Sequence, residues 1–298
     1  GEHVFLHLEK RLLNTQDLAQ RLASLSGIHP RDISYSGMKD RQAVTRQWFS
    51  VRMAGRIEPD WQALEVPGEV SVLAVARHRR KLKRGVHRAN RFQIRLTELQ
   101  GERNAVEQRL LQLQTGGAPN YFGEQRFGHG GATLDQARHW ASEGGRRINR
   151  NRRSLYLSAL RAHLFNQVLA HRVEQGTWNQ VVAGDTCMLR GTRSLFTCEL
   201  VDEDITARAA GGDLHPGLPL WGRGAGEGQA ITRVREVLAQ ERDICAFLED
   251  AGLTLAWRPA RLLPDDFCWE FCDDDSLQLD FSLGAGSYAT ALLAELLH

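Results

Sequence analysis

Residues 36–51 read Ser-Gly-Met-Lys-Asp-Arg-Gln-Ala-Val-Thr-Arg-Gln-Trp-Phe-Ser-Val, with one acid, Asp40, between Lys39 and Arg41. Gly37 before the Lys-Asp-Arg triplet, and the β-branched and aromatic run after it, predict a loop that leads into a strand. The two flanking cations favour the ionised form of the Asp40 carboxyl, because each lowers the energy of the charge. An ionised aspartate at the rim of a loop is a usable nucleophile. Taken alone, however, the triplet is more typical of a solvated charged turn.

The composition is that of an ordinary water-soluble globular protein. The chain has 298 residues, 42% hydrophobic and 25% charged, and this length favours two domains, or one domain with an insertion. No apolar run approaches the ~20 residues that a membrane helix needs, and no signal peptide opens the sequence. We therefore expect that this chain is not a membrane protein. Five scattered cysteines indicate free thiols in a reducing compartment, which predicts a cytoplasmic protein. They complete no zinc-ligand pattern, so we expect no metal.

Basic residues are clustered along the chain. Eight lysines or arginines fall within the fifteen residues 77–91, and five arginines fall within residues 146–153. Such clusters favour contact with nucleic-acid phosphates through charge neutralisation and counterion release, without sequence specificity of their own. A solvated basic face explains the clusters equally well when they are taken alone.

Periodicity divides the chain into three regions. The first has predicted strands at 3–8, 47–53, 70–75 and 91–96, and a helix from a cap at Asn14 to Gly27. The middle has predicted helices at 104–113, 154–173 and 229–251, a strand near 195–200 and a Gly/Pro-rich loop over 211–228. The last has a strictly alternating strand at 277–283, a Gly-rich turn and a short helix. A strand-rich start and end around a helix-rich middle predict one domain interrupted by an insertion.

The opening stretch resembles the signature of the TruD family of tRNA pseudouridine synthases, Gly-x-Lys-Asp-(basic)-x-Ala-Val-Thr-x-Gln-Trp, almost without a break. Three further stretches are similar to segments of that family. Residues 78–96 contain His-Arg-Arg-Lys-Leu-Lys-Arg-Gly and then Asn-Arg-Phe, residues 120–128 read Asn-Tyr-Phe-Gly-Glu-Gln-Arg-Phe-Gly, and residues 283–290 read Leu-Gly-Ala-Gly-Ser-Tyr-Ala-Thr. These matches extend from one end of the chain to the other.

The resemblance implies an α+β fold. Its pseudouridine synthase catalytic domain, built on a mixed, mainly antiparallel sheet, would comprise residues 1–115 and 262–298. A family-specific α/β insertion domain would comprise residues 116–261, and substrate RNA would lie in the cleft between the two. Family members also have a segment upstream of Gly1 with a strand and an aromatic substrate contact, so we expect one site residue to lie outside this sequence.

The resemblance also implies the chemistry, an isomerisation of uridine 13 of tRNA to pseudouridine without a cofactor. Asp40 would attack C6 of the flipped-out uracil or C1′ of its ribose, two alternatives that stay open, as does the group that removes the C5 proton. Asn90 and Phe92 would contact the target nucleotide, with the Phe92 ring stacked on the uracil. Tyr288 would contact it where the family has phenylalanine, by stacking or by a hydrogen bond. Core packing is the competing explanation for Phe92 and Tyr288.

The expected partner is tRNA, bound by a protein that we expect to be a monomer. The residues expected to contact RNA are Lys39, Arg41, Arg79, Arg80, Lys81, Lys83, Arg84, Arg146, Arg147 and Arg150. Two other functions remain open at this point. One is a non-catalytic RNA-binding protein or chaperone that has only the basic surface, and the other is a hydrolase of nucleosidic bonds, for which an aspartate nucleophile is equally suitable.

Overall fold

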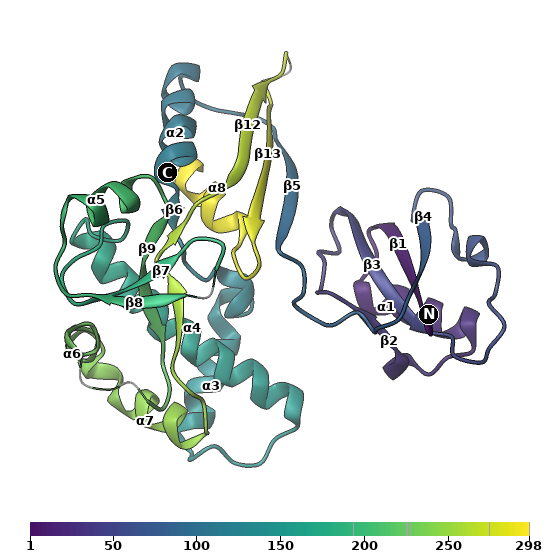
Figure 1. The fold of residues 1–298 in the computed structure, drawn as a ribbon, viewed down its shortest axis with the longest axis horizontal. Coiled ribbons are helices and arrows are strands. Elements are labelled where there is room, and N and C mark those ends of the chain that lie inside the picture. Colours follow the sequence, from purple (N-terminus) through teal and green to yellow (C-terminus); the bar gives the residue numbers. More distant parts are fainter. Residues whose placement is uncertain (193, 225, 227, 274, 298) are drawn as a thin grey trace. The chain divides into compact units, whose positions relative to one another are not determined.

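The computed structural model describes residues 1–192, 194–224, 226, 228–273 and 275–297. The chain divides into two compact units, residues 1–88 and 89–298 (Figure 1). Both contain helices and antiparallel sheets, so the predicted α+β class is confirmed. The predicted boundaries of the catalytic and insertion domains stay a prediction.

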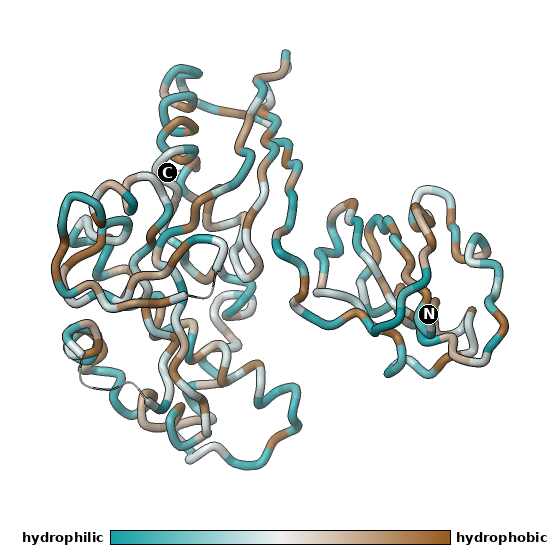
Figure 2. Tube along the Cα trace, viewed as in Figure 1, coloured by the Kyte–Doolittle hydropathy of each residue, from teal (hydrophilic) through white to brown (hydrophobic). Residues whose placement is uncertain are grey.

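The first unit is a four-stranded antiparallel sheet with one long helix. Its elements are β1 (His3–Arg11), α1 (Thr15–Ser26), η1 (Pro30–Asp32), β2 (Ile33–Tyr35), β3 (Val44–Arg52), η2 (Trp61–Leu64) and β4 (Val70–His78). The strand order is β2-β3-β1-β4. Val4, Leu6 and Leu8 occupy alternate positions of β1 and are fully buried in a core shared with Leu18 and Leu22 of α1. Brown, hydrophobic stretches lie along the strands of this unit (Figure 2).

The second unit begins with β5 (Ala89–Leu96) and α2 (Arg103–Gly116), and ends with β12 (Asp265–Phe271), β13 (Leu277–Gly284) and α8 (Ala289–Leu297). The three strands form a sheet of order β12-β13-β5. The predicted alternation of β13 is confirmed, because Leu277, Leu279, Phe281 and Leu283 are all fully buried. Exposed and half-buried residues also alternate along β5, where Phe92 is half-buried on the inner side.

Between these segments lie a second sheet and most of the helices. The elements are β6 (Ala118–Pro119), η3 (Glu124–Arg126), η4 (His129–Gly131), α3 (Ala132–Ser142), α4 (Arg150–Glu174), β7 (Asp185–Leu189), β8 (Leu195–Cys198), α5 (Glu203–Ala210), β9 (Leu214–Leu220), α6 (Gln229–Val237), η5 (Ala239–Glu241), α7 (Arg242–Asp250), β10 (Ala256–Pro259) and β11 (Arg261–Leu262). The sheet order is β10-β9-β7-β8, and α4 packs on α3 and β9. Strands β6 and β11 pair with each other, so the two ends of this segment lie side by side.

The predicted loop over 211–228 is wrong, because it contains β9, a central strand of the second sheet. The strand reads Leu-His-Pro-Gly-Leu-Pro-Leu, and its prolines and glycine suggested a turn. Six of its seven residues are buried, and Pro216 still contributes a carbonyl that accepts from the Ala260 N–H at 2.8 Å. Gly217 is required there, because a Cβ would lie 2.9 Å from the Thr186 carbonyl oxygen of the neighbouring strand.

The single helix predicted over 229–251 is also wrong, because the chain forms α6 and α7 with a break between them. Leu238 leaves the helical conformation, with φ −89° and ψ 17°. The short turn that follows brings Glu241, which is buried, within hydrogen-bond distance of Arg138, His163 and Gln167. Burial acts to raise the pKa of the Glu241 carboxyl, but the hydrogen bonds and the Arg138 charge together hold it below its ordinary value. Providing hydrogen-bond partners for the buried Glu241 carboxylate is therefore more favourable than continuing one amphipathic helix over residues 229–251.

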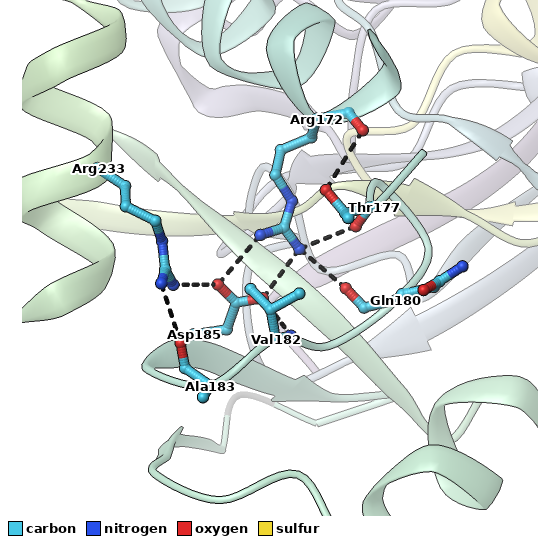
Figure 3. A network of polar contacts seen from close by, with 7 residues as sticks. All are labelled: Arg172, Thr177, Gln180, Val182, Ala183, Asp185 and Arg233. Carbon is cyan, nitrogen blue, oxygen red and sulfur yellow. Dashed lines mark hydrogen bonds and ion pairs between the residues drawn. The ribbon is translucent and has the colours of Figure 1, made fainter. Parts of the chain in front are cut away.

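A buried ion-pair network ties α4, α6 and β7 together (Figure 3). The Asp185 carboxylate accepts from both terminal nitrogens of Arg172, at 3.2 and 2.9 Å, and from Arg233 at 3.0 Å. The Val182 N–H donates to the same carboxylate at 3.0 Å. Arg172 is only 9% exposed and Asp185 only 5% exposed, so each buried charge requires the opposite charge as its partner.

Candidate active site

Residues 36–43, here called the Asp40 loop, join β2 to β3, which confirms the predicted loop before a strand. Asp40 is exposed, whereas Lys39 beside it is half-buried. Strand β3 begins at Val44, where the β-branched and aromatic run starts. The loop therefore presents a carboxylate to solution at the end of a rigid strand.

The start of helix α1 fixes the Asp40 loop in place. The hydroxyl oxygen of Thr15 accepts hydrogen bonds from the Lys39 backbone N–H at 3.0 Å and from the Gln47 side-chain amide at 3.3 Å. The same hydroxyl donates to the Lys39 carbonyl oxygen at 3.4 Å. Thr15 is fully buried, so these bonds satisfy polar groups that water does not reach.

The buried side chain of Lys10 also holds the Asp40 loop in place. The sequence analysis did not identify this residue. Its ammonium donates to the backbone carbonyl oxygen of Asp40 at 2.7 Å, and the residue retains only 1% of its exposure. A signal was present, because the alternation of Val4, Leu6 and Leu8 continues to position 10 on the buried side of β1. A lysine on the core side of a strand requires a partner, and here the partner is the Asp40 loop.

The ammonium groups of Lys10 and Lys39 interact electrostatically with the Asp40 carboxylate. Burial lowers the pKa of the Lys10 ammonium, and the Asp40 carboxylate partly opposes that shift. Burial lowers the pKa of Lys39 in the same way, and Asp40 again opposes it. Burial and the nearby Lys39 charge lower the pKa of His87, which favours its neutral form. Arg41, by contrast, is exposed, with its Nε 3.5 Å from the Leu12 carbonyl oxygen.

The basic segment, residues 79–84, lies beside the Asp40 loop within the first unit. The Leu82 N–H donates to the Ser50 hydroxyl at 3.1 Å, and the Ser34 hydroxyl donates to the Leu82 carbonyl oxygen at 2.8 Å. Gly85 donates to the carbonyl oxygen of Ser36, the first residue of the loop, at 2.7 Å. These bonds leave the basic side chains exposed, namely Arg79, Arg80, Lys81, Lys83 and Arg84. The structure thus brings the predicted nucleophile and seven predicted RNA contacts, including Lys39 and Arg41, into one unit.

Asn90 and Phe92, two of the predicted substrate residues, lie on β5 in the second unit. In the antiparallel register Asn90 is opposite Leu283 and Phe92 is opposite Phe281. The two phenylalanine rings are stacked, with centroids 5.4 Å apart and planes inclined by 24°. Both Asn90 and Phe92 are half-buried. One face of the Phe92 ring is thus engaged by the core.

Tyr288 has its hydroxyl engaged by Arg126, which donates to it from Nη2. Arg126 also donates to the Ser158 hydroxyl at 2.8 Å, and its guanidinium lies 5.9 Å from the centre of the Tyr288 ring. The edge of the Phe122 ring meets the Tyr288 ring, with centroids 6.0 Å apart. The hydroxyl that distinguishes this tyrosine from phenylalanine is therefore bonded within the protein.

Arg258 joins two of the stretches that carry the family resemblance and was missed by the sequence analysis. It donates to the Gly286 carbonyl oxygen at 2.7 Å and to the Asn120 side-chain oxygen at 2.6 Å. Its guanidinium lies 4.1 Å from the centre of the Phe122 ring. Burial lowers the pKa of Arg258 to about 10. The sequence around Arg258 does not indicate this role, because its partners Asn120 and Gly286 are 138 and 28 residues away in the sequence.

The remaining predicted RNA contacts, Arg146, Arg147 and Arg150, are exposed at the start of α4. Asn149 caps this helix by accepting from the Arg152 N–H at 2.8 Å. The first turn of α4 contains no acid. Cations at a helix N-terminus oppose the helix dipole, so helix stability does not account for this cluster.

Comparison with known proteins identifies the family. A sequence profile described as tRNA pseudouridine synthase D (TruD) matches residues 1–135 and 132–296. The chain is 48% identical to tRNA pseudouridine synthase D of Methylococcus capsulatus over 298 residues, which cover 99% of this chain and 84% of that protein. It is 45% identical to tRNA pseudouridine synthase D of Nitrosococcus oceani, covering 99% of this chain and 83% of that protein. The chain belongs to the TruD family.

A solved TruD structure has the same fold. The crystal structure of a Methanosarcina mazei protein assigned to tRNA pseudouridine synthase D (TruD) superposes with a TM-score of 0.69, covering 99% of this chain and 88% of that one at 19% identity. TruD membership confirms the predicted enzyme class, an isomerase that forms pseudouridine in RNA.

Several other expectations stay predictions. No helix within the described ranges is both long enough and apolar enough to cross a membrane. Among the side chains that the structure describes, no group of three or more His, Cys, Asp or Glu could hold a metal ion. The cytoplasmic compartment, the monomeric state and independence from a metal stay predictions.

Proposed function

We propose that this protein isomerises uridine 13 of tRNA to pseudouridine, with Asp40 as the nucleophile. The supporting observation is an exposed carboxylate on a loop that Thr15 and Lys10 fix from two sides. Exposure leaves the carboxylate accessible to a nucleotide, and the fixed backbone limits the orientations that it samples. Lys10 and Lys39 place two ammonium groups next to this loop, and the Asp40 carboxylate opposes the lowering of their pKa values by burial.

The reaction replaces the N1–C1′ glycosidic bond by a C5–C1′ bond. The Asp40 carboxylate attacks C6 of the uracil or C1′ of the ribose, the glycosidic bond breaks, and the base turns before C5 bonds to C1′. The C5 proton is then lost, N1 gains a proton, and the carboxylate leaves unchanged. Atoms and charge balance without a cofactor or an energy source. Base extrusion costs a few kcal/mol, which contacts of basic residues with phosphates offset.

Asn90, Phe92 and Tyr288 are proposed to contact the target nucleotide. Phe92 stacks on Phe281 with one face and is only partly buried, which suits a base stacked on its other face. Tyr288 would contact the nucleotide with its ring, because its hydroxyl is engaged by Arg126.

The second RNA contact is proposed for the insertion, residues 116–261. The pairing of β6 with β11 supports this domain, because it closes the segment into a unit with adjacent ends. Arg146, Arg147 and Arg150 are exposed at the N-terminal end of α4, where backbone N–H groups and the helix dipole also favour an anion. A tRNA phosphate would offset the unfavourable charge of the cluster.

The position of the modified nucleotide is tested with two tRNA transcripts. The protein should form one pseudouridine, at position 13, in a transcript with uridine there. It should form none in a transcript with cytidine at 13, because only uridine undergoes the rearrangement. Carbodiimide modification followed by primer extension maps the product. Binding of both transcripts without any product would favour the non-catalytic RNA-binding protein instead.

The arginine cluster is tested by charge reversal. Changing Arg146, Arg147 and Arg150 together to glutamate should weaken tRNA binding by about tenfold or more at 100 mM salt, and reduce the salt slope by about three. A filter-binding assay over a series of salt concentrations measures both. The matched control reverses three exposed arginines elsewhere in the same unit, Arg103, Arg109 and Arg235. Equal losses for the two triple variants would contradict the proposal.

A further inference from the structure

The first unit contains a hollow of about 590 Å³ that is separate from the Asp40 loop. It is lined by the start of α1, by β2 with the turn before it, and by the basic segment. Among the described residues that line it, none belongs to residues 36–43. The volume is within the range of pockets that hold small organic groups.

The lining combines three kinds of surface. Four cations surround the hollow, namely Arg31, Lys81, Lys83 and Arg84, and none of the described lining residues carries a carboxylate. Ile33, Tyr35 and Leu82 contribute apolar surface, and the side-chain amides of Gln16 and Gln20 come from α1. Cations suit a phosphate, apolar surface suits the face of a base, and amides that donate and accept suit its edge.

Two of the four cations, Lys81 and Arg84, are held in place by contacts within the unit. Lys81 donates from Nζ to the Arg31 carbonyl oxygen at 2.8 Å. The Arg84 guanidinium lies over the Tyr35 ring, 5.5 Å from its centre. Leu82, between them, is fixed to β2 and β3 through the Ser34 and Ser50 hydroxyls. The hollow is thus built by hydrogen bonds between the basic segment and the sheet.

We propose that this hollow holds one unpaired nucleotide of the substrate RNA, other than the target uridine. Its phosphate would contact the cations, its base would lie on the apolar surface, and Gln16 and Gln20 would bind the base edge. This inference rests on the proposed function, because the ligand is the same RNA. It also links the hollow to the chemistry, since Thr15 fixes the Asp40 loop and Gln16 follows it in the same helical turn.

The test removes the amides without changing the charge. The double variant Gln16→Ala and Gln20→Ala should bind tRNA about tenfold more weakly, the loss expected for two hydrogen bonds. The salt slope of binding should stay unchanged, because no phosphate contact is removed. Both glutamines are exposed on α1, and alanine is the better helix former, so the fold should be preserved. Gln108→Ala with Gln112→Ala is the matched control, with the same spacing on the exposed side of α2.

Two results would overturn the inference. One is equal tRNA affinity for the Gln16/Gln20 variant and the control, which would mean that the cations form only a non-specific basic surface. The other is calorimetric binding of free uridine 5′-monophosphate that the Gln16/Gln20 variant loses while it keeps full tRNA affinity, which would assign the hollow to a free nucleotide. Failure of the proposed function is distinguishable from failure of this inference, because it would be seen as the absence of pseudouridine in tRNA treated with the unchanged protein.

Discussion

Replacing Asp40 by asparagine is expected to abolish pseudouridine formation, with a loss on the order of 10³-fold or more. An amide has no charge with which to attack carbon, so no covalent link to the nucleotide forms. The fold should not change, because the side chain is exposed and Lys10 bonds to the backbone oxygen of residue 40. Binding of tRNA should remain within a few-fold of the unchanged protein. Carbodiimide mapping gives the activity, and filter binding gives the affinity.

Two controls make the Asp40 result specific. Asp32→Asn removes a nearby surface carboxylate from the same unit and should leave activity unchanged, because this carboxylate is paired with Arg31, at 4.0 Å. The unchanged protein should release no free uracil from tRNA, whereas release would indicate a hydrolase. Pseudouridine formed by the Asp40→Asn variant at a rate near normal would refute the assignment of the nucleophile.

The largest effect on stability is expected from Asp185. Replacing it by alanine removes the acceptor of four hydrogen bonds and leaves Arg172 buried without a carboxylate (Figure 3). Breaking a buried pair in this way costs about 3–5 kcal/mol. At about 2–4 °C for each kcal/mol, the melting temperature should fall by about 6–20 °C. Differential scanning calorimetry measures the change.

Asp213 provides the matched control for Asp185. It also pairs with an arginine, Arg208, at 2.7 Å, but its side chain is 53% exposed. Replacing Asp213 by alanine should cost less than about 1 kcal/mol, because solvent screens the pair. Similar melting temperatures for the two variants would show that burial does not govern the strength of these ion pairs, contrary to the argument above.

Elements with one uniform local pattern could be predicted from the sequence. In β13 strict alternation gave both the strand and its buried face, since successive side chains of a strand point to opposite sides. In α1 the start after Asn14 and the end at Gly27 were both correct, although the Asn14 side chain donates to Asp17 and makes no capping hydrogen bond. Gly27 has the left-handed conformation, with φ 64°, that glycine adopts at low cost.

Elements could not be predicted where the local sequence favours one structure and contacts with distant residues favour another. Strand β9 contains two prolines and a glycine, yet pairing on both sides and burial make it the centre of a sheet. The break at Leu238 likewise depends on where Glu241 finds its partners, and Arg138 and His163 are 103 and 78 residues away in sequence.

Local sequence was sufficient for the family, for the position of Asp40 in a loop before a strand, and for the buried faces of β1 and β13. Each of these follows from residues within a few positions of one another, where spacing and composition carry the information. Three contacts became evident only in the folded protein: Lys10 holds the Asp40 loop, Arg258 joins residues 120 and 286, and Asp185 pairs with two arginines. Those contacts join distant segments, and the burial that makes them strong exists only after the chain has folded.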